Sequence, residues 1–371
     1  MLETSHYIEL LIRQGVSFAT GVPDSLLKSL CQQLSAQKQI PHVTAVSEGA
    51  AVGLAIGHHL ASSGLPLVYM QNSGLGNAVN PLLSLADSEV YGIPMLLLIG
   101  WRGEPGIKDE PQHQKQGRVT KALLDAMEIP FEVLEEGLAE KQLEQLLRLA
   151  RKNSCPVALL VRKESFTTEL DDASAASSFN LMSREEAIQC VVHQLGRDTA
   201  VVATTGMASR ELYEYRCHHD VLSGQDFLTV GGMGHASQIA LSVSMFKPEQ
   251  RVCCLDGDGA ALMHLGGIAS NAVLANENYL HVLLNNGCHD SVGGQATIAD
   301  RVNWPALAVA VGFKQAESVA SPTQLRALLA QPRQKALFVE IQIAAGHRAD
   351  LGRPTSSPKQ NKKSFMEFLD G

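Results

Sequence analysis

The chain has 371 residues, of which 45% are hydrophobic and 18% are charged, a length and composition typical of a two-domain globular protein. Its formal net charge of −8 argues against a nucleic-acid partner and against a membrane surface as partner, and no apolar run is long enough to span a membrane. Seven cysteines without a Cys-x-x-Cys pair predict reduced thiols in a cytoplasmic protein.

Strand and helix patterns alternate through the first half of the chain. Helices are expected between apolar strands, and a long polar loop is expected over 101–117. The expected strands cover 17–21, 42–46, 66–71, 95–100, 131–134 and 156–162. Such alternation predicts an α/β domain with a parallel sheet, which we assign to residues 1–165.

Small and polar residues fill 166–183, and we interpret this stretch as a linker. A second α/β series follows and predicts a second domain over 184–371, with an irregular basic tail from Gly346 and a short last helix near 364–369. Its expected strands lie near 200–203, 227–230, 252–255, 280–284 and 337–343.

Two neighbouring strands of the second domain end in polar residues. The strand 251–255 leads to Asp256-Gly257-Asp258-Gly259-Ala260, followed by a small-residue helix expected over 261–275, and the strand 279–284 ends in Asn285-Asn286. Both ends fall on the carboxyl edge of a parallel sheet, where ligands bind. A carboxylate and an amide oxygen suit Mg²⁺, and a helix N-terminus suits a diphosphate. The alternative is an ordinary strand-turn-helix.

The Gly-Asp-Gly at 257–259, the Asn-Asn at 285–286 and the 25 residues between them resemble the signature of thiamine-diphosphate (ThDP) enzymes. The resemblance implies two ThDP-binding-fold domains, each a parallel sheet flanked by helices: a pyrimidine-binding domain over 1–165 and a diphosphate-binding domain over 184–371. It implies ThDP and Mg²⁺ as cofactors. The implied metal ligands are Asp258, Asn286 and the backbone carbonyl of Cys288, and the implied diphosphate contacts are Gly257, Gly259 and Ala260.

Further segments resemble parts of the cofactor site in these enzymes. The segment Ser47-Glu48-Gly49-Ala50-Ala51 is similar to the one that carries the activating glutamate, although a Glu beside an N-cap Ser is also favourable for the helix alone. The Gly-rich stretch 229–236 implies a pyrimidine contact at the Gly231 carbonyl and an apolar wedge at Met233; the alternative is a turn with Met as core filler. Thr205 and Gly206 resemble another diphosphate-binding turn.

Polar residues also follow three strands of the first domain. Asp24 and Ser25, Asn72, and the stretch 102–116 with Arg102, His113 and Lys115 are candidates for the mouth of a pocket, although a solvated loop is the more common structure. The resemblance implies proton-relay roles for Asp24 and His113. The family's usual Glu after Asn-Asn is missing, so Asp290 and His289 are further candidate acids.

The chain also resembles a narrower family, the phosphonopyruvate decarboxylases. The resemblance is carried by Gly-Val-Pro-Asp-Ser at 21–25, Asp-Glu-Pro-Gln-His at 109–113 and His-Asp-Ser-Val-Gly-Gly-Gln at 289–295, among other segments. It implies decarboxylation of 3-phosphonopyruvate to 2-phosphonoacetaldehyde in phosphonate biosynthesis. Sulfopyruvate decarboxylase or another ThDP-dependent 2-oxo acid decarboxylase is the alternative. A nucleotide-binding protein is a different class, but neither Gly-x-Gly-x-x-Gly nor a P-loop is present.

A phosphonate substrate needs cationic donors, and we expect one of the basic side chains of the first-domain loop or the tail to supply them. The candidates are Arg102, Lys115, Arg348 and Arg353, with the tail folded over the pocket as a lid. In the family Glu48 and Asp258 come from different chains, so a homodimer or larger assembly with sites between subunits is implied.

Overall fold

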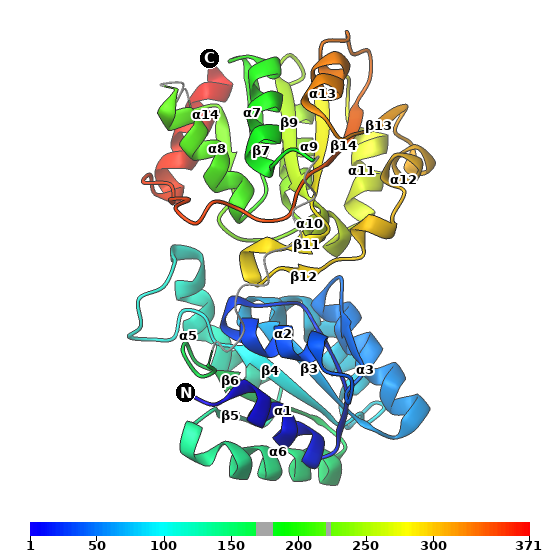
Figure 1. The fold of residues 1–371 in the computed structure, drawn as a ribbon, viewed down its shortest axis with the longest axis vertical. Coiled ribbons are helices and arrows are strands. Elements are labelled where there is room, and N and C mark those ends of the chain that lie inside the picture. Colours follow the sequence, from blue (N-terminus) through cyan, green and yellow to red (C-terminus); the bar gives the residue numbers. More distant parts are fainter. Residues whose placement is uncertain (168–180, 220–223) are drawn as a thin grey trace. The chain divides into compact units, whose positions relative to one another are not determined.

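The computed structural model describes residues 1–167, 181–219 and 224–371. It divides into two compact units, Met1–Ala173 and Ser174–Gly371, each with its own parallel sheet (Figure 1). Most of the predicted linker 166–183 lies outside the described residues, and its boundaries stay a prediction. At its described ends, Phe166 is buried in the core of the first unit and Met182 in the core of the second.

The first unit holds a six-stranded sheet in the order β2-β1-β3-β4-β6-β5, in which all neighbouring strands are parallel. The strands are β1 (Val16–Gly21), β2 (His42–Thr44), β3 (Leu65–Gln71), β4 (Met95–Gly100), β5 (Phe131–Val133) and β6 (Pro156–Val161). The helices are α1 (Thr4–Arg13), α2 (Lys28–Ala36), α3 (Glu48–Ser62), α4 (Leu75–Pro81), α5 (Pro111–Ala126) and α6 (Ala139–Asn153).

Helices cover both faces of this sheet because its central strands are apolar on both sides. In β4, Leu96 and Leu98 belong to the core under α1, α2 and α6, whereas Leu97 and Ile99 belong to the core under α3, α4 and α5. The side chains of a strand point alternately to opposite faces, so an unbroken apolar run fills both cores. All six residues of β4 are buried.

The second unit repeats this plan with the order β13-β14-β10-β9-β7-β8, again with parallel neighbours. The strands are β7 (Thr199–Ala203), β8 (Asp226–Leu228), β9 (Arg251–Gly257), β10 (Tyr279–Asn285), β13 (Gln315–Val319) and β14 (Leu337–Gln342), with a separate hairpin of β11 (Cys288–His289) and β12 (Gln295–Ala296). The helices are α7 (Arg184–Leu195), α8 (Met207–His218), α9 (Ala236–Phe246), α10 (Asp258–Met263), α11 (Gly266–Leu274), α12 (Trp304–Val311), α13 (Pro322–Leu329) and α14 (Pro358–Asp370). The predicted α/β class with two parallel sheets is confirmed.

Each sheet has a point where the chain reverses its direction of strand addition, and such switch points form ligand-binding crevices at the carboxyl edge. In the first unit this point lies between β1 and β3, and in the second it lies between β7 and β9. The polar turns after β1 and β3, and those after β7 and β9, therefore occupy the two positions at which this fold class binds ligands.

Four sequence expectations about local structure were wrong. The expected loop 101–117 is helical from Pro111, and the expected helix 261–275 is divided into α10 and α11. The polar edge strand β13 was not expected. The last helix starts at Pro358, with Ser357 as its N-cap in a capping box with Gln360, so part of the expected irregular tail is helical.

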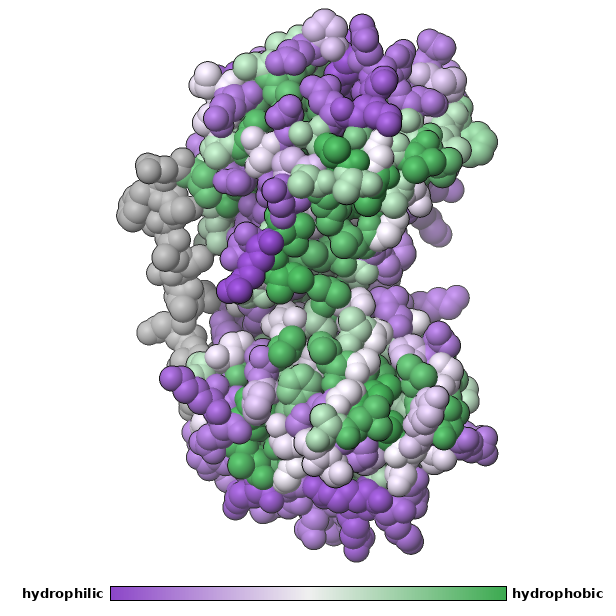
Figure 2. All heavy atoms as spheres, turned by 90° about the vertical axis from the view of Figure 1, so that its right-hand side faces the viewer, coloured by the Kyte–Doolittle hydropathy of each residue, from purple (hydrophilic) through white to green (hydrophobic). Residues whose placement is uncertain are grey.

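Large apolar side chains remain exposed on both units, and Figure 2 shows hydrophobic surface on the viewed face of each. In the first unit they include residues on α3 and just after α4, and in the second they include residues on α9 and α11. The residues are Leu54, Leu60, Leu83 and Leu85 in the first unit, and Met245, Phe246, Val273 and Leu274 in the second. Across the described residues, no helix combines the length and apolar content that a membrane crossing requires.

Candidate functional site

Arg102 lies at the centre of a polar cluster in the first unit, just after β4. Its Nε and Nη2 donate to the two carboxylate oxygens of Asp109 at 2.8 and 2.5 Å, and its Nη1 donates to Ser25 Oγ at 2.8 Å. A guanidinium has five N–H donors. Within the described contacts two of the five are left for another acceptor, so Arg102 can still grip an anion.

Asp109 organises this cluster, although it is not among the predicted site residues. Besides Arg102 it accepts from the Gly103 backbone N–H at 2.8 Å and contacts His113 Nδ1 at 3.0 Å. Although some burial opposes it, these donors hold the pKa of Asp109 well below its usual range. The i, i+4 spacing of Asp109 and His113, beside the helix-start signal of Pro111, could have indicated the pair.

His113 lies on α5 and is uncharged near neutral pH, because burial lowers its pKa more than Asp109 raises it. An ionised carboxylate can only accept, so Nδ1 carries the hydrogen and Nε2 is left as an acceptor. In this tautomer His113 can take up a proton at Nε2 and then return it. Lys115, predicted beside it, is on the exposed side of α5.

Asp24 lies in the turn after β1 and is 1% exposed, and its Oδ2 accepts from the Leu26 backbone N–H at 3.2 Å. Burial raises the pKa of this carboxyl to about 6, although the charge of Arg102 opposes the shift. Its Oδ1 is buried without a hydrogen-bond partner in the described structure. A buried carboxyl with a pKa in this range and one unsatisfied oxygen is suited to proton transfer.

Asn72 has a structural contact that the sequence did not suggest. Its Nδ2 donates to the Arg102 carbonyl and to Thr120 Oγ1, both at 2.9 Å, and its Oδ1 accepts from the Arg102 N–H at 3.2 Å. The amide therefore fixes the backbone that carries the Arg102 side chain. Its predicted role as a substrate contact remains a prediction.

Glu48 begins α3, where Ser47 caps the helix by accepting from the Ala50 N–H at 3.3 Å. The Glu48 side chain turns inward and is 5% exposed. Burial raises its pKa, opposed by a hydrogen bond of 2.8 Å from Asn77 Nδ2 to its Oε2. A Glu that is exposed in the first turn of a helix would only stabilise the helix through its dipole. Glu48 is instead buried with a raised pKa, which is typical of residues in functional sites.

In the second unit, Thr297 joins the two turns that carry the predicted metal ligands. Its Oγ1 donates to Asp258 Oδ2 at 2.6 Å, and its N–H donates to the Gly287 carbonyl at 2.8 Å. Asp258 is 3% exposed, and burial raises its pKa to about 6. A cation beside this carboxylate would offset the cost of burying its charge.

Asn286 and Cys288 form the second of these turns, and Asp290 holds it. Asn286 donates from Nδ2 to Asp290 Oδ2 at 2.6 Å, and its Oδ1 accepts from the Cys288 N–H at 3.2 Å. The Cys288 thiol donates to Asp290 Oδ1 at 3.1 Å. Despite partial burial, hydrogen bonds from Cys288 and Arg184 keep the pKa of Asp290 below its usual value. Asp290 is thus an acceptor in this turn, and its predicted role as a catalytic acid remains a prediction.

The remaining predicted cofactor contacts lie in turns and at helix starts of the second unit. A Cβ at Gly259 would lie 2.6 Å from His289 Cε1 and 3.4 Å from Met233 Cε, so only glycine leaves room there. Gly206 precedes α8 with φ of 96°, a conformation that favours glycine. Gly231 lies in the loop between β8 and α9, and Ala260 is buried on α10.

Gln295 was not predicted, yet both polar atoms of its amide are buried without a hydrogen-bond partner in the described structure. It pairs with His289 across the β11–β12 hairpin, so the two side chains share a face, and the His289 ring lies against Gly259. Thr204 Oγ1, after β7, is likewise buried and unsatisfied. Unsatisfied groups of this kind are costly and indicate missing partners.

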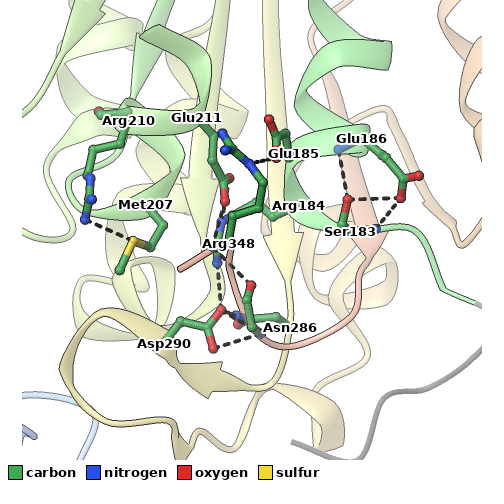
Figure 3. Close-up of polar contacts among 12 residues, drawn as sticks. Ser183, Arg184, Glu185, Glu186, Met207, Arg210, Glu211, Asn286, Asp290 and Arg348 are labelled. Atoms are coloured by element: carbon green, nitrogen blue, oxygen red, sulfur yellow. Dashed lines mark hydrogen bonds and ion pairs between the residues drawn. The ribbon is translucent and has the colours of Figure 1, made fainter. Parts of the chain in front are cut away.

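Arg348 is held by acidic side chains of its own unit. Its Nε donates to Glu185 at 2.8 Å, its Nη1 to Asp350 at 3.0 Å and its Nη2 to Glu214 (Figure 3 draws the contact with Glu185). The following residues are also bonded to α8, since Arg210 Nε donates to the Gly352 carbonyl at 2.6 Å. These contacts favour Arg102 over Arg348 as an anion ligand, whereas Arg353 is exposed.

The second unit therefore has the groups that Mg²⁺ and a diphosphate require. Asp258 and Asn286 offer oxygens, and Thr204 and Gln295 hold buried polar atoms without hydrogen-bond partners in the described structure. Hard oxygen donors with one carboxylate are the set that Mg²⁺ prefers when phosphate completes its shell. The residues fit the implied cofactors.

Comparisons with known proteins agree with this chemistry. Residues 4–128 match the family model of the thiamine pyrophosphate enzyme N-terminal TPP binding domain, and residues 203–343 match that of the C-terminal TPP binding domain. The phosphonopyruvate decarboxylase of Streptomyces hygroscopicus is 34% identical, covering 99% of this chain and 94% of that protein.

The phosphonopyruvate decarboxylase of Streptomyces viridochromogenes is 33% identical, covering 100% of this chain and 95% of that protein. The sulfopyruvate decarboxylase of Methanosarcina acetivorans is 28% identical, with 98% and 96% covered. The resemblance inferred from the motifs is confirmed. The chain belongs to the thiamine pyrophosphate enzymes and, among them, to the ThDP-dependent decarboxylase family of these relatives.

Proposed function

We propose that this chain decarboxylates 3-phosphonopyruvate to 2-phosphonoacetaldehyde and CO₂ with ThDP and Mg²⁺. The observation that carries the proposal is the joined pair of turns in the second unit, in which Thr297 links Asp258 to the Asn286 turn. The names of the two full-length Streptomyces relatives support the substrate. Loss of CO₂ makes the step effectively irreversible, which would draw phosphonate biosynthesis forward.

Residues 184–371 act as the diphosphate-binding domain and residues 1–165 as the pyrimidine-binding domain. Mg²⁺ would be held by Asp258 Oδ, Asn286 Oδ1 and the Cys288 carbonyl, and the diphosphate by the turns at Thr205-Gly206 and 257–260. Bound ThDP supplies the electron sink that decarboxylation of a 2-oxo acid requires. Glu48 holds a proton at the pyrimidine ring nitrogen, for which a buried carboxyl with a raised pKa is suited.

Asp24 and His113 move the protons of the reaction. Asp24 is buried with a pKa raised to about 6, so it exchanges a proton close to neutral pH. His113 carries its hydrogen on Nδ1 toward Asp109, which leaves Nε2 to exchange a proton with the substrate. Asp290 accepts hydrogen bonds from Arg184 and Asn286, and its role is to keep the metal-binding turn in place.

Arg102 binds the phosphonate. Its remaining N–H donors offer a planar fork for two phosphonate oxygens, and Ser25 contributes a neighbouring hydroxyl. Asp109 keeps the guanidinium in place and Asn72 keeps its backbone in place. Lys115 and Arg353 are further cations that can add to the potential around the substrate.

We further propose a homodimer or larger assembly in the cytoplasm, with each site built from Glu48 of one subunit and Asp258 of another. The exposed apolar side chains of α3, α9 and α11 support association, because contacts between subunits would remove them from water. All seven cysteines, each in the described part of the chain, are free thiols, which fits a reducing compartment.

A sulfopyruvate decarboxylase is the second candidate, supported by the full-length relative at 28% identity. Both candidate activities can be tested by measuring CO₂ release. The substrates are phosphonopyruvate, sulfopyruvate and pyruvate, each with and without ThDP and Mg²⁺. The proposal expects the highest kcat/KM with phosphonopyruvate and no release after EDTA treatment. A preference for sulfopyruvate would transfer the assignment to the second candidate, and no cofactor-dependent release from any of the three would refute both.

A further inference from the structure

Arg184, the first residue of α7, makes a buried ion-pair network that no step of the proposed reaction uses (Figure 3). Its Nε and Nη2 donate to the two carboxylate oxygens of Glu211 at 2.9 and 3.0 Å. Its Nη1 donates to Asp290 Oδ2 at 2.8 Å. The side chain of Arg184 is 8% exposed and that of Glu211 is 3% exposed. The guanidinium thus has two carboxylate partners away from bulk water.

Asp290 links Arg184 to two residues that are predicted to bind the metal, Asn286 and Cys288. The same Oδ2 that accepts from Arg184 also accepts from Asn286 Nδ2 at 2.6 Å, and Oδ1 accepts from the Cys288 thiol at 3.1 Å. The Gly346 N–H, at the start of the tail, also points to this carboxylate, 3.1 Å from Oδ1. Because Nδ2 of Asn286 is engaged, the amide oxygen is the atom that it can present to a cation.

The charges of this network also favour a cation nearby. Arg184 contributes one positive charge, whereas Glu211 and Asp290 contribute two negative charges. A buried ion pair contributes little net stability compared with apolar residues of the same size. A network that leaves an excess of negative charge beside two oxygen ligands is better explained by a site for a divalent cation than by stability.

We propose that Arg184 is a positioning residue for the metal-binding turn, acting through Asp290 to fix the orientation of the Asn286 amide. This inference rests on the proposed function, because it presumes that Asn286 is a ligand of Mg²⁺. Groups that hold metal ligands in place commonly change metal affinity about 10- to 100-fold when they are altered. Arg184→Lys retains the charge but loses the planar fork that bonds Glu211 and Asp290 together.

The experiment compares Arg184→Lys with a matched control, Arg216→Lys. Arg216 makes the same buried two-pronged contact with Asp226, at 2.9 and 3.1 Å, but Asp226 lies on edge strand β8, separated from β10 by β7 and β9. For each protein, Mg²⁺ is titrated into protein with ThDP by calorimetry, and the Tm is measured without cofactors. We expect both variants to lose Tm, and only Arg184→Lys to raise the apparent Kd for Mg²⁺, by about tenfold.

Asp290→Asn provides a second variant and a test of the pathway. If Arg184 acts through Asp290, the double variant Arg184→Lys/Asp290→Asn should bind Mg²⁺ no more weakly than Asp290→Asn alone. Additive losses of Mg²⁺ affinity, or equal losses in Arg184→Lys and Arg216→Lys, would overturn the inference. The wild-type titration separates the two claims: absence of Mg²⁺-dependent ThDP binding there would refute the proposed function itself.

Discussion

Asn77 Nδ2 donates a hydrogen bond of 2.8 Å to Glu48 Oε2, and this contact joins α4 to the first residue of α3. A Cβ at Gly74 would lie 2.3 Å from the other carboxylate oxygen of Glu48, so a glycine is required there. The Glu48 carboxyl is therefore confined between Asn77 and Gly74. Confinement of this kind is what a residue with a fixed catalytic geometry needs.

Glu48→Gln and Asp258→Ala should separate proton transfer from cofactor binding. We expect Glu48→Gln to retain most of the ThDP affinity, because the side chain keeps its volume, and to lose activity by about 10²–10⁴-fold, the usual contribution of a general acid or base. Asp258→Ala removes the carboxylate that would bind Mg²⁺, so ThDP and Mg²⁺ affinity should fall together. Calorimetric titration of both variants measures this; equal ThDP affinities would contradict the assigned roles.

Asp24→Asn should make the protein more stable at neutral pH and less active. Burial raises the pKa of Asp24 to about 6, above the value of about 3.9 for an unfolded chain. The folded state therefore binds this proton more tightly. Its contribution to stability is fully present below the unfolded pKa and is lost as pH rises through the folded pKa.

At pH 7 the wild-type protein has lost this contribution, so Asp24→Asn should raise the free energy of unfolding by about 1–3 kcal/mol. Urea unfolding at pH values on both sides of this window tests the expectation, with decarboxylation measured in parallel. A variant that is less stable than wild type at pH 7, with the difference disappearing as the pH falls, would show that Asp24 is stabilised as an anion.

Much of the fold follows from local patterns, and so do the turns of the site. The unbroken apolar run of β4 identifies a buried parallel strand, and Asp258 and Asn286 each follow such a strand. Where the sequence was misread, the local signal was weak or was overlooked. Pro111 at the start of α5 is a helix-start signal within the supposed loop, and β13 has the polar composition that is typical of an edge strand.

The residues that hold the site could not be found in this way. Arg184 and Asp290 are 106 positions apart, and Thr297 is 39 positions from Asp258. Such pairs form because of how the helices and strands pack. Their spacing in the sequence follows neither the helix nor the strand period, so a single sequence does not indicate them. Arg348 was predicted as a substrate ligand from its positive charge, and its contacts with three carboxylates could not be foreseen from the sequence either. Its role as a substrate ligand remains a prediction.

Gln295→Leu should stabilise the protein without cofactors and weaken its cofactor binding. The two buried amide atoms without hydrogen bonds cost stability, and Leu of similar size removes both, so the free energy of unfolding should rise by about 1–3 kcal/mol. If the side-chain amide of Gln295 forms hydrogen bonds with bound ThDP, the Kd of the Gln295→Leu variant for ThDP should be about tenfold higher or more. Thermal unfolding with and without ThDP measures both effects, and an unchanged ThDP Kd would exclude Gln295 from the cofactor site.

Mixed assemblies should show whether a site combines two chains. Glu48→Gln and Asp258→Ala are each expected to be inactive alone, but if Glu48 and Asp258 of one site come from different subunits, a mixed dimer has one site with both residues intact. Exchange of the two variants should restore up to about a quarter of the wild-type activity, since half of the dimers are mixed and each has one of two sites. Subunit exchange is verified with differently tagged chains; verified exchange without recovery would mean that each chain builds its own site.

Arg102 should determine the preference for a charged 2-oxo acid. Loss of a charged hydrogen bond to the phosphonate is expected to cost about 2–4 kcal/mol in kcat/KM for phosphonopyruvate and almost nothing for pyruvate, which has no such group. Arg102→Lys keeps the charge without the planar fork, so its kcat/KM for phosphonopyruvate should lie between those of wild type and Arg102→Ala.

Arg348→Ala is the matched control, because Glu185 and Glu214 already engage its guanidinium. The measurement is the ratio of kcat/KM for phosphonopyruvate to that for pyruvate in each variant. A ratio that falls equally for Arg102→Ala and Arg348→Ala, or in neither, would mean that another cation, such as Lys115 or Arg353, binds the phosphonate.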